Sequence, residues 1–308
     1  MTTGGPHDCV LLNACGAAYD VAAGATRYVP GATFSPDVPY LRPPGVACNG
    51  PGLINAATVG QCPFGIVVAF RGTIAPTETD PDSWMDWLYD FFAVPYTSDS
   101  GPFRLPGQVH RGFFDATTSI VEQVHALIVE LAPGPDNPVF ITGHSKGGPM
   151  ATIAALILTQ NMGVPGVEPV VTFASPRPGD PAFRRGFDAS LRQIRYENYG
   201  DIVPLVPPSL TWFEKLVSGL IGGSHVARRL HDLLLRARDW NYVPVGEKLF
   251  ITRHGTVTPG EPDMLQELAI VAEVTEDLVS GNFASFARAH SLAPGGGYNR
   301  GACGAGGG

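Results

Sequence analysis

Runs of apolar residues alternate with amphipathic stretches along most of this chain. Residues 65–70, 139–142 and 170–174 are apolar or β-branched at successive positions, the pattern of strands buried on both faces of a sheet. Residues 112–132 carry apolar side chains at helical spacing, and 150–158 read as a further apolar helix. Strands and helices that alternate in this way predict an α/β fold with a mostly parallel central sheet flanked by helices.

Weaker patterns extend this arrangement to both ends of the chain. Proline and glycine are frequent over residues 29–52, which predicts an irregular surface segment followed, after the next strand, by a turn at 60–63. The other predicted elements are helices over 8–24, 181–191 and 264–278, and strands over 53–59, 193–199 and 249–252.

Composition places the chain among globular domains and excludes several classes of partner. Of its 308 residues, 44% are hydrophobic and 16% charged, and nothing marks a boundary, so residues 1–308 are expected to form a single domain. The net charge of −8, without a basic run, argues against nucleic-acid binding and against an anchor for anionic membranes. No apolar stretch reaches the roughly 18 residues of a transmembrane helix. The first residues lack the basic and apolar regions of a secretory signal, although a chain from which a signal had been removed would look the same.

Five cysteines leave one over whatever the pairing. Cys9, Cys15, Cys48 and Cys62 lie near the N-terminus, and Cys303 lies in a glycine-rich tail. Reduced thiols and one or two disulfides within the N-terminal group are both compatible with this spacing. A zinc site is not expected, because no Cys-x-x-Cys pair or histidine cluster accompanies the cysteines.

One pentapeptide, Gly143-His144-Ser145-Lys146-Gly147, follows a predicted strand directly and leads into a predicted helix. Strand, sharp turn and helix form the context of a nucleophile elbow, in which the serine is strained and the flanking glycines avoid collisions. The pentapeptide therefore predicts that Ser145 is a nucleophile; the alternative is a glycine-rich turn without chemistry.

Two further strand ends carry groups that could serve such a nucleophile. Thr73 follows a strand and a glycine, so that its N–H and hydroxyl could bind an oxyanion, although a lone threonine there is also a common turn-capping residue. Asp201 follows the predicted strand 193–199, where an α/β sheet gathers functional groups, and could accept the Nδ1–H of a histidine. The alternative for Asp201 is a local hydrogen bond within the turn.

Four histidines follow Asp201 in the chain, the order in which α/β-hydrolases place their base. His225 and His231 lie in a segment that looks like an added helical excursion, and His254 is expected to turn a surface hairpin. His290 follows the last long predicted helix, and it and His254 are the candidates for the general base.

Five ordered segments together resemble the class 3 lipases, the group that includes the triacylglycerol lipases of filamentous fungi. They are residues 70–73, 109–113, 143–148, 172–177 and 201–204. The resemblance implies an α/β-hydrolase fold, a Ser145–His290–Asp201 triad, and an oxyanion hole formed by Thr73 and the N–H of Lys146. Many related sequences have leucine at the position of Lys146, which leaves that N–H unchanged. The interval from His290 to Tyr298 is longer than the His-x-x-x-Tyr spacing common in the family.

The same resemblance implies a lid between residues 74 and 109. Trp84, Trp87, Leu88 and Phe91 would form one apolar stripe on a short helix there, as lid and acyl-binding residues; a stripe packed on the core is the alternative. Residues 209–240 depart from the family pattern, and either a helical hairpin or a second flap fits them. Residues 295–308 are rich in glycine, which predicts a flexible tail.

These patterns predict a carboxylic ester hydrolase, in the first place a lipase that cleaves acylglycerols through an acyl-enzyme. Within enzymes, phospholipase A1 and a soluble esterase for short-chain or aromatic acids are alternatives, and outside enzymes a catalytically silent lipid-binding protein. The chemistry requires no metal or organic cofactor. An ester or lipid is the expected partner, with transient contact to a lipid interface, and no oligomeric state is predicted.

Overall fold

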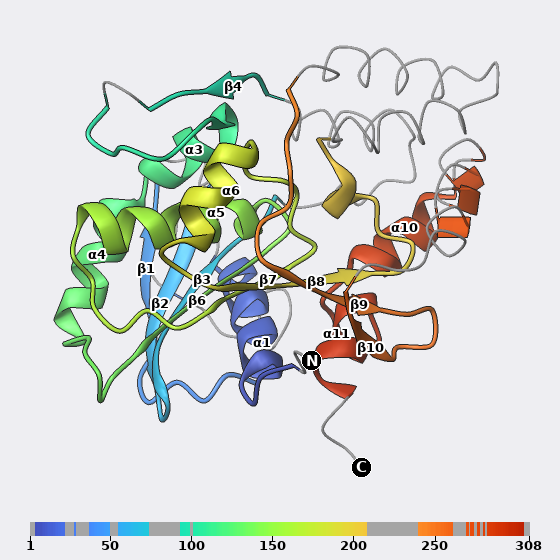
Figure 1. The fold of residues 1–308 in the computed structure, drawn as a ribbon. Helices are drawn as coiled ribbons and strands as arrows, with labels where there is room; N and C mark the ends of the chain where they lie inside the picture. Colours follow the sequence, from blue (N-terminus) through green and yellow to red (C-terminus); the bar gives the residue numbers. More distant parts are fainter. Residues whose placement is uncertain are drawn as a thin grey trace.

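The structure is a computed structural model that describes residues 4–21, 28, 37–49, 55–73, 93–98, 101–207, 240–260 and 282–304, with individual residues between 269 and 280. An eight-stranded sheet with the order β1-β2-β3-β6-β7-β8-β9-β10 runs through the molecule (Figure 1). Strands β3, β6, β7, β8 and β9 are parallel to one another, whereas β1 and β2 at one edge and β10 at the other are antiparallel to their neighbours. The predicted α/β class with a mostly parallel sheet is confirmed.

The strands of this sheet are β1 (Gly45–Cys48), β2 (Ala56–Cys62), β3 (Gly65–Phe70), β6 (Val139–His144), β7 (Val170–Phe173), β8 (Gln193–Asn198), β9 (Glu247–Ile251) and β10 (Val257–Pro259). A separate two-stranded pair consists of β4 (Pro95–Tyr96) and β5 (Val109–His110). The helices are α1 (Asp8–Tyr19), α3 (Arg111–Thr118), α4 (Val121–Glu130), α5 (Gly147–Leu156), α6 (Pro181–Asp188), α10 (Phe283–His290) and α11 (Gly297–Ala302). A π-helical turn, Ile157–Asn161, extends α5, and a 3₁₀ turn spans Val203–Leu205.

Two hydrophobic cores lie on opposite faces of the sheet, and β3 contributes to both. Ile66 and Val68 belong to the core shared with α3, α4, α5 and α6, whereas Val67 and Ala69 belong to the core shared with α1 and α11. Side chains alternate between the faces of a strand, so a strand covered on both sides must be apolar at every position. This is why the pattern at 65–70 predicts a central strand.

Two predictions about the first strands are wrong. Gly45–Cys48 lies in the segment expected to be irregular but forms β1, which pairs with β2. The turn expected at 60–63 is also misplaced, because β2 continues to Cys62 and only Pro63 and Phe64 form the turn to β3. A Cβ at Gly60 would meet the ring of Tyr40 at 2.6 Å. Gly60 therefore marks a close approach to a strand and not a turn.

The helix predicted over 112–132 is divided into α3 and α4. Three consecutive hydroxyl side chains at the end of α3 donate hydrogen bonds back to helix carbonyls: Thr117 to Phe113 O at 2.8 Å, Thr118 to Phe114 O at 3.0 Å and Ser119 to Ala116 O at 2.7 Å. Side chains that compete for backbone carbonyls weaken a helix. This competition explains why apolar periodicity overestimates the length of the helix.

The end of the chain differs from the flexible tail predicted over 295–308. Residues Gly297–Ala302 form α11, and Tyr298 is fully buried. A disulfide joins Cys9 in α1 to Cys303, so the two ends of the described chain lie side by side (Figure 1). A disulfide within the N-terminal group of cysteines is therefore not formed: Cys15, Cys48 and Cys62 are free thiols.

Several predictions concern residues outside those that the structure describes. They are the lid stripe of Trp84, Trp87, Leu88 and Phe91, the insertion from 209 to 239, and the last residues of the tail, 305–308. In the described part of the chain, no helix is both long enough and apolar enough to cross a lipid bilayer.

Candidate active site

Ser145 lies in a sharp turn between β6 and α5, at the carboxyl end of the central strands. Its φ of 56° is in the left-handed region, which side chains other than glycine seldom adopt. A Cβ at Gly143 would collide with the carbonyl of Gly147, and a Cβ at Gly147 with the carbonyl of Phe70. Both glycines are thus required for the turn to close against its neighbours.

The hydroxyl of Ser145 is enclosed. The residue is fully buried, and within the described part of the chain Oγ makes no hydrogen bond. Its own N–H donates to Phe173 O on β7 at 3.0 Å, which holds the turn against the sheet. The backbone of Ser145 is thus held in place, and the lone pairs of its Oγ are not engaged by a donor in the described part of the chain.

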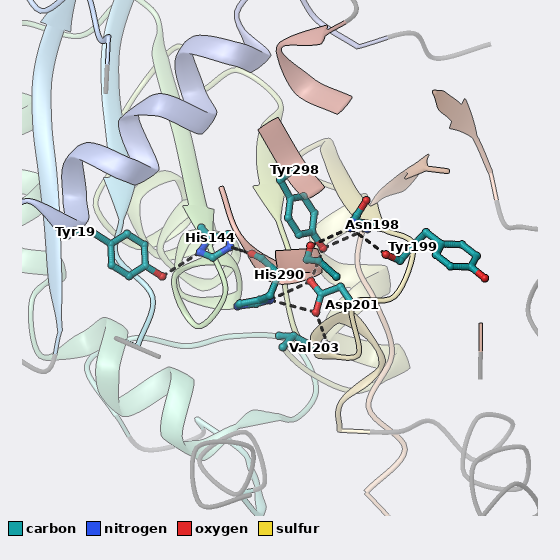
Figure 2. A network of polar contacts seen from close by, with 9 residues as sticks. Tyr19, His144, Asn198, Tyr199, Asp201, Val203, His290 and Tyr298 are labelled. Carbon is teal, nitrogen blue, oxygen red and sulfur yellow. Dashed lines mark hydrogen bonds and ion pairs between the residues drawn. The ribbon is translucent and has the colours of Figure 1, made fainter. Parts of the chain in front are cut away.

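Asp201 and His290 form a buried pair at the same end of the sheet (Figure 2). Nδ1 of His290 lies 3.0 Å from Oδ2 and 3.2 Å from Oδ1 of Asp201. Asp201 follows β8, as the sequence predicts, but His290 is the last residue of α10 and not part of a loop. Because the carboxylate faces Nδ1, it selects the tautomer in which Nε2 is the basic nitrogen.

The Asp201 carboxylate has two further donors. The N–H of Val203 donates to Oδ1 at 3.0 Å, and the hydroxyl of Tyr298 donates to Oδ2 at 2.6 Å. Burial and then the neighbouring charge of Asp201 raise the pKa of Tyr298 well above its ordinary value, so the hydroxyl keeps its proton. With the histidine, three donors hold the carboxylate in one orientation.

Tyr298 was not among the predicted site residues, although its position after His290 was the available signal. It reaches Asp201 because α11 turns the chain back beneath β8, where the N–H of Asn198 also donates to the tyrosine oxygen at 3.3 Å. His144 was not predicted either, because the sequence motif that contains it does not indicate the distant residues with which its side chain forms hydrogen bonds. It links the elbow to α10 through the His290 carbonyl at 2.8 Å.

The predicted oxyanion-hole residues are Thr73 and Lys146: Lys146 follows Ser145 directly in the chain, and Gly72, the residue before Thr73, approaches Ser145 in space. Thr73 lies in residues 71–73, which follow β3, and a Cβ at the preceding Gly72 would meet Ser145 Cβ at 2.8 Å. Lys146 is the N-cap of α5, and its Nζ donates to Asn55 Oδ1 at 2.9 Å. The first N–H groups of a helix have no partner within the helix and favour negative charge, so this corner suits a developing oxyanion.

Of the remaining histidine candidates, the structure describes only His254. His254 is exposed in the turn between β9 and β10, as expected of a hairpin residue, whereas His225 and His231 lie outside the described residues. Among the described side chains, no three histidine, cysteine or acidic residues form a group able to hold a metal ion.

Comparison with known proteins identifies relatives of both sequence and fold. The sequence profile of the family described as Lipase (class 3) matches residues 67–211. Phospholipase A1-II 7 of Oryza sativa subsp. indica is 30% identical over 64% of this chain and 58% of that protein. Phospholipase A1-II 3 of the same rice is 34% identical over 58% of this chain and 46% of that protein. The chain thus spans about half the length of the curated relatives that it matches.

Two solved structures show the same fold at lower identity. The Rhizomucor miehei lipase in its propeptide complex superposes with a TM-score of 0.56 and 22% identity, over 87% of this chain and 76% of that one. A mutant form of MDLA from Penicillium cyclopium gives a TM-score of 0.57 and 19% identity, over 93% and 94%. With the ordered motifs and the sheet described above, these similarities lead to one conclusion: residues 67–211 carry the sequence profile of the class 3 lipases, and the chain has the α/β-hydrolase fold.

Proposed function

We propose that this protein is a serine hydrolase of carboxylic esters in which Ser145, His290 and Asp201 form the catalytic triad. The observation that carries the proposal is the buried Asp201–His290 pair, in which the His290 carbonyl is hydrogen-bonded to His144, the residue before a serine held at a φ of 56° in a strand–turn–helix elbow. A carboxylate, a histidine and a strained serine in this arrangement are the groups that acyl transfer requires.

In the first half of the reaction, Ser145 Oγ attacks the ester carbonyl while Nε2 of His290 accepts its proton. Asp201 stabilises the imidazolium that forms. The position of His290 at the last residue of α10 adds to this effect, because the carboxyl end of a helix favours positive charge. His290 then protonates the leaving alcohol, and the acyl group stays on Ser145.

In the second half, a water molecule attacks the acyl-enzyme while His290 accepts its proton; the bond to Ser145 Oγ then breaks, His290 returns the proton to Oγ, and the carboxylic acid leaves. In both halves the carbonyl oxygen carries negative charge in the transition state. The N–H groups of Thr73 and Lys146 and the Thr73 hydroxyl are the proposed donors to that oxygen. Removal of one such donor costs roughly 3 kcal/mol of transition-state stabilisation in serine hydrolases.

Acylglycerols are the substrates that we propose first, and phospholipids cleaved at one acyl ester are the second candidate. The second candidate is favoured by the rice relatives, which are named phospholipases A1-II. The acyl-enzyme chemistry is the same for both, so the head group that leaves with the alcohol distinguishes them. Paired assays on emulsified triacylglycerol and on phosphatidylcholine vesicles separate the two candidates.

The burial of Ser145 supports activity at a lipid surface. Because Ser145 is fully buried, an ester can reach Oγ only after part of the protein moves. We propose that the segment 74–109, with its predicted stripe of Trp84, Trp87, Leu88 and Phe91, opens as a lid when that stripe meets lipid. The proposal predicts a rise in rate as a substrate passes its solubility limit.

The decisive experiment measures hydrolysis of p-nitrophenyl esters of increasing acyl length by the purified protein and by Ser145→Ala. We expect turnover by the wild type, a preference for longer chains, and loss of at least about 10³-fold in kcat in the variant. Ser119→Ala, which removes a hydroxyl from the end of α3, is the control and should retain activity. Absence of turnover on every ester, or full turnover by Ser145→Ala, would contradict the proposal.

A further inference from the structure

His144, the residue before the proposed nucleophile, has a ring whose two nitrogens both have partners. Nε2 lies 2.8 Å from the carbonyl oxygen of His290, and Nδ1 lies 3.0 Å from the hydroxyl of Tyr19 (Figure 2). A carbonyl oxygen can only accept, so Nε2 of His144 carries the proton and donates. In the neutral ring Nδ1 is then an acceptor, and the Tyr19 hydroxyl must donate to it.

His144 stays neutral in this position. Burial lowers the pKa of His144 well below its ordinary value of 6.5, and the neighbouring charge of His290 lowers it further. The two rings lie 4.8 Å apart between centroids. When His290 takes up a proton during the reaction, His144 therefore remains a neutral donor to its carbonyl.

The hydrogen bond from His144 also completes the end of α10. The last carbonyls of a helix have no partner within it, and buried ones need donors from elsewhere. Asn198 Nδ2 donates to Ala289 O at 2.9 Å, and His144 Nε2 donates to His290 O. The backbone of the catalytic base is thus attached directly to the residue that precedes the nucleophile.

Tyr19 connects the same network to residues 71–73, the oxyanion loop, which follows β3 and carries Thr73. It is the last residue of α1, and a Cβ at Gly72 would collide with its hydroxyl. One hydroxyl therefore lies between the loop that carries Thr73 and the elbow that carries Ser145.

We propose that Tyr19 and His144 are positioning residues that fix the oxyanion loop, the nucleophile elbow and the general base relative to one another. The hydrogen bonds run in one direction, from Tyr19 O–H to His144 and from His144 Nε2–H to the His290 carbonyl, while Gly72 packs against the Tyr19 hydroxyl. Neither side chain takes part in proton transfer. This inference rests on the proposed ester hydrolysis and assigns the groups that keep its parts together.

The first test is Tyr19→Phe, which retains the ring and removes only the hydroxyl. We expect kcat on p-nitrophenyl esters to fall about 10- to 100-fold, because displacements of about 1 Å at reacting groups have effects of this size. KM should change less than about threefold, since no substrate contact is lost. Tyr196→Phe is the matched control: it removes another buried hydroxyl on the α1 face, one that donates to Asp8 at 2.6 Å, and should leave kcat unchanged.

The second test compares two substitutions of His144. His144→Gln keeps an N–H donor and an oxygen acceptor at the end of a side chain of similar reach, and should retain much more activity than His144→Leu, which has neither. Thermal midpoints verify that each variant folds; if His144→Leu does not fold, Tyr19→Phe and its control decide the matter alone. Equal losses in the glutamine and leucine variants would overturn the role assigned to His144.

The outcomes distinguish this proposal from the one on which it rests. An unchanged kcat in Tyr19→Phe, together with an inactive Ser145→Ala, would overturn the positioning network and leave the triad intact. A fall in activity in Tyr19→Phe that the Tyr196→Phe control matches would also overturn it, because a general loss of stability would then explain the effect. Full turnover by Ser145→Ala would instead remove the proposed triad itself.

Discussion

At the scale of single residues, Asp201 combines a proposed catalytic role with several hydrogen bonds that only a carboxylate can accept. Its carboxylate accepts from His290, Val203 and Tyr298, so an amide there would have to turn a donor toward groups that are themselves donors. We expect Asp201→Asn to lower kcat by roughly 10³- to 10⁴-fold with little change in KM. The amide would no longer select the tautomer of His290 in which Nε2 is basic, and it would supply no negative charge to stabilise the imidazolium. Steady-state kinetics of this variant beside Asp188→Asn, an exposed acid on α6, measure the effect. A loss of less than about tenfold would mean that Asp201 only shapes the turn after β8.

At the scale of elements, α11 carries Tyr298 beneath Asp201 and is attached to α1 by the disulfide between Cys9 and Cys303. Crosslinks that close long loops stabilise proteins by about 2–4 kcal/mol, so Cys303→Ser should lower the thermal midpoint by several degrees and reduce kcat as the hydrogen bond to Asp201 weakens. In calorimetry, a reducing agent should lower the thermal midpoint of the wild type by the same amount as the Cys303→Ser substitution does, and should leave the midpoint of the variant unchanged. Cys48→Ser, which removes a free thiol, serves as control. An unchanged midpoint and kcat in Cys303→Ser would show that packing alone holds α11.

At the scale of the whole molecule, stability in acid depends on a buried ion cluster between β8 and β9. Oxygens of Glu197 lie 2.7 Å from Arg195 and 2.7 Å from Lys248, all largely buried. Burial raises the pKa of Glu197, but the two cations outweigh it and bring it from 4.5 to about 2. A depressed pKa in the folded state contributes stability above pH 4.5 that is lost as the pH falls toward 2.

Removal of this carboxylate tests that contribution. We expect Glu197→Gln to lower the free energy of unfolding at pH 7 by about 3–5 kcal/mol, as breaking a buried ion pair does. The acid limb of its stability curve between pH 4.5 and 2 should also be flatter than that of the wild type. Urea denaturation at a series of pH values, beside the exposed Glu247→Gln, measures both effects. Parallel acid limbs in wild type and variant would contradict the assignment.

Local patterns were sufficient for the centre of the fold and for the sharp turn around Ser145. The strands β3, β6 and β7 are apolar at successive positions because helices cover both faces of the sheet, and this requirement is written directly into adjacent residues. The elbow around Ser145 is equally local, since its glycines relieve collisions within one turn. Position at a strand end indicated Asp201 and Thr73 for a related reason: parallel strands bring their carboxyl ends to one edge.

Tertiary structure decided what joins these local pieces. Periodicity could not show that three hydroxyl side chains would end α3 at Thr118, nor that the glycine-rich tail would form α11. The bond from Tyr298 to Asp201 and the disulfide between Cys9 and Cys303 join residues 97 and 294 positions apart.

Of the site, the sequence by itself determined the elbow at Ser145 and the strand-end positions of Asp201 and Thr73. Only the tertiary structure assigned Tyr19 and His144 their partners and brought His290 to Asp201 from the end of a helix. The physical reason is that helices and strands leave a period in the sequence, whereas a hydrogen bond between distant side chains depends only on where the folded chain brings them.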